Sequence, residues 1–105
     1  MSKNNNTFST KNSYSQALFE LASEGNSAND IENQVSSILE LIRKSEDIKE
    51  FIKDPTNKIE DQLKIINAIS DQFKFNELLK KFLGFTVTKR KFFYIEKILN
   101  DFLFI

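Results

Sequence analysis

The scarcity of helix-breaking residues constrains this chain most, because its 105 residues include only two glycines and one proline. A fold with many strands needs many tight turns, and tight turns draw on those two residue types. Apolar residues instead recur at helical spacing along most of the chain, and no stretch shows the alternation of a half-buried strand. The sequence therefore predicts an all-α fold in a single domain.

Six apolar stripes predict a six-helix bundle over residues 13–105, preceded by a polar tail. Residues 1–12 carry little apolar surface, so they cannot offset the entropy of ordering, and we expect them to be flexible. Pro55 ends one helix and pushes Asp54 toward extended geometry. The helices are expected near residues 13–24, 29–44, 46–53, 58–72, 76–89 and 91–104.

Short polar side chains predict where these helices begin and end. Gly25 and Asn26 indicate a left-handed end to the first helix. Ser27 and Asp30 have the spacing of a loose capping box at the second. The remaining expected helix starts are Ser45 for the third, Thr56 or Asn57 for the fourth, and a position near Asn76 for the fifth.

The first and fifth helices carry more apolar surface than one core requires. A helix that covers a core needs an apolar arc of about 100° or somewhat more. The arcs are about 200° wide in these two helices and about 160° wide in the second and fourth. Two interpretations remain open: other helices of the chain cover the excess, or the two helices border a groove that accepts a partner helix.

The sixth stripe is apolar nearly all round, which favours a central, buried helix. Its last four residues, 102–105, are Phe-Leu-Phe-Ile, and four consecutive positions cover every side of a helix. Some of these side chains should therefore be exposed. We expect the chain to continue beyond Ile105 in its native form, with the continuation covering them.

The residue types that most enzymes use are absent. The chain has no cysteine and no histidine, and its two glycines are isolated, so we expect neither catalysis nor a metal or cofactor site. Lys plus Arg and Asp plus Glu are both 15, which gives no general attraction to nucleic acid or anionic lipid. No apolar run approaches the roughly 18–20 residues that span a bilayer, so we expect no direct membrane insertion.

One short segment leaves an alternative function open. Residues 89–93 read Lys-Arg-Lys-Phe-Phe, and basic residues beside aromatic ones can bind single-stranded nucleic acid. These aromatics also fall within a helical apolar pattern, and the cations sit where the fifth helix should end. The alternative is a small helical nucleic-acid-binding protein that uses Lys89 to Phe93.

Several segments in register resemble one known family, the delta subunit of F-type ATP synthase, which is equivalent to the mitochondrial oligomycin-sensitivity-conferring protein. Residues 14–22, Tyr-Ser-Gln-Ala-Leu-Phe-Glu-Leu-Ala, are similar to its opening helix motif. The order and spacing agree from residue 14 to 102. The other matching segments are 45–48, 51–55, 78–84, 90–92 and 98–102.

The resemblance implies a non-catalytic stator adaptor. In the family, this domain holds the N-terminal helix of an alpha subunit against its first and fifth helices. The complete subunit links the catalytic head to the peripheral stalk b subunits through a C-terminal domain that is absent here, and so resists rotor torque during proton-driven synthesis. The implied location is the cytoplasmic face of the bacterial inner membrane, or the equivalent matrix side, through the complex.

The helix spacing and the resemblance together predict which side chains border the partner groove. Ala17 is small and would let a partner backbone approach closely. Phe85 lies at the edge of its apolar arc, where burial within the bundle is hardest to complete. The residues expected at the groove are Tyr14, Ala17, Leu18 and Leu21 on the first helix, and Phe82, Phe85, Thr86 and Lys89 on the fifth.

One departure from the family concerns the junction between the last two helices. Many relatives have Asn-Gly-Arg where this chain has Lys89, Arg90 and Lys91. Without that glycine a sharp left-handed cap loses its usual residue. The sequence therefore leaves room for a less abrupt turn at this point.

Overall fold

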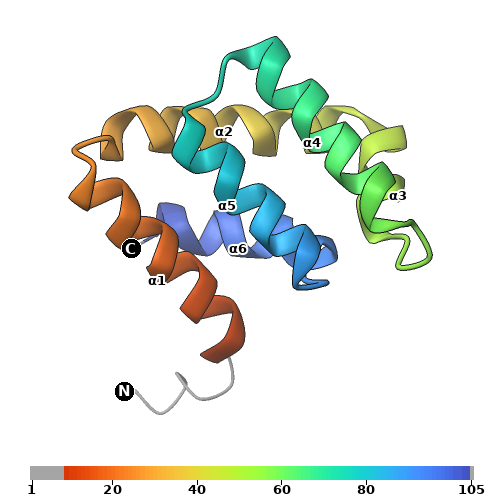
Figure 1. Ribbon diagram of the computed structural model, residues 1–105, viewed down its shortest axis with the longest axis horizontal. Coiled ribbons are helices and arrows are strands. Elements are labelled where there is room, and N and C mark those ends of the chain that lie inside the picture. Colours follow the sequence, from red (N-terminus) through yellow and green to blue (C-terminus); the bar gives the residue numbers. More distant parts are fainter. Residues whose placement is uncertain (1–8, 105) are drawn as a thin grey trace.

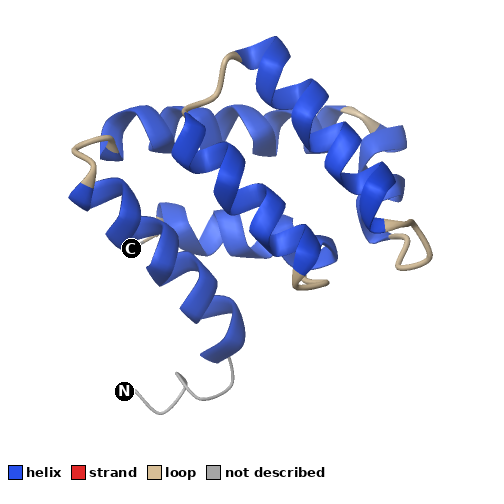
Figure 2. Cartoon of the chain, in the orientation of Figure 1, coloured by secondary structure: helices blue, strands red, loops and turns tan. Residues whose placement is uncertain are grey.

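The computed structural model describes residues 9–104, and the side chains from residue 13 onward. This part of the chain contains helices and no strand (Figures 1 and 2), which confirms the all-α prediction. The described elements are α1 (Ser9–Glu24), α2 (Ala28–Lys44), α3 (Glu46–Lys53), α4 (Ile59–Phe73), α5 (Glu77–Thr88), the 3₁₀ helix η2 (Phe92–Tyr94) and α6 (Ile95–Leu103).

Helix α1 begins at Ser9, earlier than the predicted start near residue 13. No glycine or proline interrupts the four polar residues that precede Ser13. Once a docked helix has formed, each residue added at its end gains a hydrogen bond without a new nucleation cost. The rest of the tail that we expect to be flexible, residues 1–8, lies outside the described residues.

Helix α6 buries one face in the core and exposes the other at Lys97 and Asn100, so the prediction of a central helix that is apolar nearly all round is wrong. It packs chiefly against α1 and also against α2, while α5 packs against α4. Figure 1 shows α5 slanting from α2 down across α6, with α1 lying below α2 at the C-terminal end of α6. Four side chains of α6 are almost fully buried, namely Ile95, Ile98, Leu99 and Phe102.

Helix α6 is shorter than predicted, because residues 92–94 form the tighter 3₁₀ turn and the α-helix starts at Ile95. The expected exposure at the apolar end is found at Phe104, whose side chain is 88% exposed. Ile105 lies outside the described residues.

Two of the expected helix caps are confirmed and two are wrong. The Ser45 hydroxyl accepts a hydrogen bond from the Ile48 N–H at 3.2 Å, and the Asn76 side chain accepts one from the Leu78 N–H at 2.8 Å. Asp54 is extended, as Pro55 requires.

The wrong predictions concern side chains that bond to nearer partners. Ser27 occupies the cap position of α2, but its hydroxyl donates to the Gly25 carbonyl. Neither Thr56 nor Asn57 caps α4, which starts after Lys58. Both donate hydrogen bonds back toward α3, Thr56 to the Asp54 carboxylate and Asn57 to the Phe51 carbonyl. Local turns of this kind compete with helix capping.

Three helices end in a left-handed residue that is not glycine. Asn26, Lys74 and Arg90 have φ angles of 59°, 55° and 61°. Asn26 confirms the predicted end of α1. At Arg90 the next N–H, that of Lys91, reaches back to the Thr86 carbonyl at 2.8 Å. This pattern is the Schellman motif, so the junction keeps the sharp turn that the loss of the family glycine had put in question.

Replacing Arg90 with glycine is expected to stabilise the fold. A left-handed conformation costs a residue with a Cβ roughly 1–2 kcal/mol, and part of this gain is lost to the greater freedom of glycine in the unfolded chain. We expect a net gain of about 1 kcal/mol, or about 4–8 °C in Tm. Thermal unfolding followed by circular dichroism measures it. Lys64→Gly, at an exposed position within α4, is the control and should lose about 1 kcal/mol.

Candidate protein-interaction face

Helices α1 and α5 lie side by side and run in opposite directions. The rings of Tyr14 and Phe85 are 5.9 Å apart at one end of the contact. Gly25 lies beside Leu78 at the other end. In Figure 1 the C-terminal end of α1 and the N-terminal end of α5 accordingly point to the same side of the molecule. The interpretation that these two helices are neighbours is thus confirmed.

Their shared outer surface is more apolar than most of the molecule's exterior. We call it the α1–α5 face. Leu21 and Phe85 are 44% and 46% exposed, and they are two of the five large apolar side chains that the described residues expose. Ala17 is exposed as well, and Tyr14 is half-buried. The face consists of Tyr14, Ala17, Leu21, Leu78, Phe85 and Lys89.

Three of the predicted groove residues lie beneath this face. Leu18 and Thr86 are fully buried, and Phe82 is 5% exposed. The Thr86 hydroxyl donates to the Leu83 carbonyl at 2.6 Å, within its own helix. Their side chains support the exposed residues from below and are not available to a partner at the surface. That the remaining residues border a binding site stays a prediction.

The core holds both helices firmly, so the face is a rigid platform. The buried Ser15 hydroxyl donates to the Ile98 carbonyl at 2.7 Å and joins α1 to α6. On the same side of α1, the Phe19 ring lies 6.5 Å from that of Phe102. At the start of α5, the Asn76 N–H donates to the Gln34 side chain at 2.8 Å, which ties that end to α2. A preorganised surface lowers the entropy that binding must overcome.

Charged residues flank the apolar part of the face. The Lys89 ammonium lies over the Phe85 ring, 5.7 Å from its centroid. At this distance the π face of the ring attracts the cation. Lys81, one helical turn before Phe85, is exposed as well. Sequence reasoning missed Lys81 and Leu78, although the four-residue and seven-residue spacings to Phe85 indicate the same side of α5.

The described residues form one small apolar cavity and larger, more open hollows. The apolar cavity between α2, α3, α4 and α6 has a volume of about 30 Å³, and the hollow beside Ser37, Lys44 and Phe73 has a volume of about 450 Å³. Within residues 9–104, no three acidic side chains gather as a cation site would require. The helices in this range are also too short or too polar to cross a membrane.

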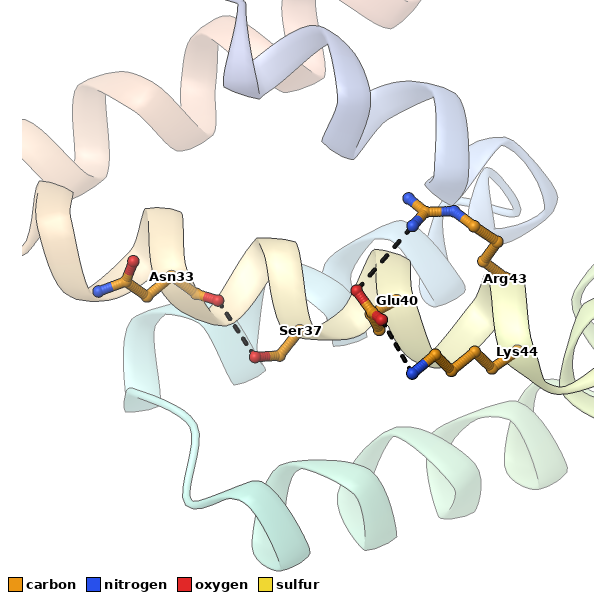
Figure 3. Close-up of polar contacts among 5 residues, drawn as sticks. All are labelled: Asn33, Ser37, Glu40, Arg43 and Lys44. Carbon is orange, nitrogen blue, oxygen red and sulfur yellow. Dashed lines mark hydrogen bonds and ion pairs between the residues drawn. The ribbon is translucent and has the colours of Figure 1, made fainter.

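The Glu40 carboxylate on α2 forms exposed ion pairs within its own helix. Glu40 pairs with Lys44 at 3.0 Å and with Arg43 at 3.9 Å, and Ser37 donates to the Asn33 carbonyl on the same helix (Figure 3). A hydrogen bond from Lys44, together with the charge of that residue, holds the pKa of the Glu40 carboxyl below its ordinary value. The group is a solvated partner in exposed ion pairs and is not poised for proton transfer.

In the segment behind the nucleic-acid alternative, Arg90, Phe92 and Phe93 line one hollow, whereas the two lysines lie over different rings. Phe92 is 5% exposed and belongs to the core. Lys89 lies over Phe85 on the α1–α5 face, whereas the Lys91 ammonium lies 5.9 Å from the centroid of the Tyr94 ring. Stacking of successive bases needs neighbouring exposed rings along a basic groove. Of the two phenylalanines in the segment, only Phe93 is exposed.

Comparison with known proteins adds an independent finding. Residues 10–104 match the family described as ATP synthase delta (OSCP) subunit. The chain is 54% identical over 103 residues to ATP synthase subunit delta of Pelagibacter ubique (strain HTCC1062), a match that covers 97% of this chain and 56% of that relative. It is 33% identical over 89 residues to ATP synthase subunit delta of Beijerinckia indica, covering 85% and 47% respectively.

These matches cover most of the present chain but only about half of each relative. The chain spans about half the length of the curated relatives it matches. No solved structure matches it.

Proposed function

This chain belongs to the ATP synthase delta (OSCP) subunit family, and from that premise we propose that its α1–α5 face binds the N-terminal helix of an alpha subunit. The domain would then serve as the head-binding part of a stator adaptor. Its role is mechanical and non-catalytic: it holds the catalytic head and resists the torque that the rotor applies during proton-driven ATP synthesis.

One observation carries this proposal. Leu21 and Phe85 expose apolar surface on two adjacent helices, and the small Ala17, one turn before Leu21 on α1, is exposed as well. An amphipathic helix that lays its apolar stripe on such a surface buries both side chains. Removal of apolar surface from water is favourable by about 25 cal/mol per Å².

The rest of the proposal concerns the assembled enzyme. The remainder of a full-length subunit would contact the peripheral stalk b subunits and so complete the link from head to stalk. The domain would reach the membrane through the complex, on the cytoplasmic face of the bacterial inner membrane or the equivalent matrix side. Neither link requires an apolar anchor within this domain.

Titration with a synthetic peptide of the alpha-subunit N-terminus tests the binding. The chain has no tryptophan, so a tryptophan placed on the peptide is the sole indole fluorophore. We expect saturable binding, a gain of helical circular dichroism, and amide shifts concentrated on α1 and α5. A peptide that fails to bind, or one that shifts α3 and α4 instead, would contradict the proposal.

A parallel titration with single-stranded oligonucleotide separates the two functions. A site that neutralises phosphates weakens steeply as salt rises. Because Phe92 is buried and Lys89 and Lys91 lie over different rings, we expect no saturable binding of the oligonucleotide at physiological ionic strength. Tight, salt-sensitive binding would favour the nucleic-acid function over the stator function.

A further inference from the structure

The two long edges of the α1–α5 face carry opposite charges. On α5, Lys81, Phe85 and Lys89 are spaced four residues apart, so the two lysines and the exposed ring share one side of the helix. On α1, Glu20 follows Ala17 by three residues, and Glu24 follows Leu21 by three. All four charged residues are exposed. The face therefore carries cations along α5, on either side of Phe85, and carboxylates along α1.

These charges are not committed to partners within the fold. Among the side chains that the structure describes, none of the four has an opposite charge within ion-pair distance. Lys89 instead lies over the Phe85 ring. The basic edge is about 12 Å long, because its lysines are eight residues apart at 1.5 Å each. A bound helix with carboxylates two turns apart would meet both lysines at once.

We propose that these four charges set the direction in which the partner helix binds. The occupant is an amphipathic helix with carboxylates on one flank of its apolar stripe and cations on the other. Its carboxylates pair with Lys81 and Lys89, and its cations pair with Glu20 and Glu24. Turning the helix end to end exchanges its flanks and brings like charges together, which disfavours the reversed orientation. This inference rests on the proposed function, since it concerns the same face.

Two designed peptides test the inference directly. Both have the same composition and the same apolar stripe, but glutamates and lysines exchange flanks between them. Each carries a nitroxide at its N-terminus, which broadens nearby amide signals of the isotopically labelled chain. We expect one peptide to broaden signals near Glu77 and the other to broaden signals near Thr88, at the opposite ends of α5. Broadening at the same end, or at both ends equally, would overturn the inference.

Charge reversal at the basic edge provides the second arm. In the double variant Lys81→Glu, Lys89→Glu, we expect the directional preference to vanish and affinity for the peptides to fall about tenfold, since each exposed pair contributes modestly. The matched control, Lys53→Glu with Lys64→Glu, changes the net charge equally at exposed positions on α3 and α4. It should keep both preference and affinity. A preference that survives in the first variant would refute the role of these lysines.

The two proposals fail in different ways. If the peptides bind and Ala17→Asp abolishes binding, but direction does not follow charge, the face binds a helix through apolar contact alone. The orientation inference is then wrong and the proposed function stands. If neither the designed peptides nor the alpha-subunit peptide binds, the face is not a helix-binding site and both fail.

Discussion

Replacing Ala17 with aspartate should weaken binding of the alpha-subunit peptide about a hundredfold while leaving the domain folded. Ala17 is exposed, as are two apolar side chains of the same face, Leu21 on its own helix and Phe85 on α5. A partner helix seated there would bury the new carboxylate without a charge to pair with it. Such burial costs at least a few kcal/mol, and about 1.4 kcal/mol is tenfold in affinity.

The cost to folding should be small, because Ala17 is exposed among the residues that the structure describes. Aspartate is a poorer helix former than alanine by about 0.5–0.7 kcal/mol, which lowers Tm by only a few degrees. Ala68→Asp is the matched control, an exposed alanine within α4 and away from the face. It should lose similar stability and no affinity.

Fluorescence titration and thermal melts of the two variants distinguish the possible outcomes. Wild-type affinity in Ala17→Asp would place the binding site elsewhere. Complete unfolding would mean that Ala17 faces the core, against its exposure in the structure.

Truncating Leu99 to alanine should have the largest effect on stability. Leu99 is fully buried on α6, which packs against both α1 and α2. Substitution of a buried leucine by alanine typically costs about 2–5 kcal/mol, because a cavity adds to the lost burial. For a domain of this size that is a fall in Tm of at least about 10 °C.

Urea unfolding monitored by circular dichroism measures the loss. The neighbouring exposed residue supplies the control: Asn100→Ala should change the free energy of unfolding by less than about 0.5 kcal/mol. Because α6 supports α1, Leu99→Ala should also weaken peptide binding under conditions where part of the protein is unfolded. A loss no larger than that of Asn100→Ala would mean that the buried face of α6 does not anchor the core.

Local features of the sequence were sufficient where the relevant physics is local. Periodicity predicted the helices, because a stripe that recurs at helical spacing can be buried on one side only in that conformation. Ser45 and Asn76 could be identified as caps because each bonds an N–H two or three residues away. The same reasoning was wrong at Ser27, Thr56 and Asn57, where another nearby backbone or side-chain acceptor took the bond.

The functional face shows the limit of pattern alone. Ala17 and Leu18 belong to one apolar arc, yet Ala17 is exposed and Leu18 is fully buried. An arc about 200° wide is broader than the contact with one neighbour, so spacing cannot say which part of it meets the core. On α5, likewise, Thr86 is fully buried and its neighbour Phe85 is exposed. Only the packing of α6 against α1, and of α4 against α5, decides which side chains are left at the surface.

The turn at Arg90 is the clearest case of tertiary control. An arginine has no intrinsic preference for a φ of 61°, and the residues on either side do not favour it. The chain adopts this conformation because Phe92 and Ile95 must both enter the core directly after α5 ends. Sequence alone determined that helices form and roughly where they stop. The tertiary structure decided how they turn and which residues they leave exposed, because burial of the core outweighs the strain of one residue.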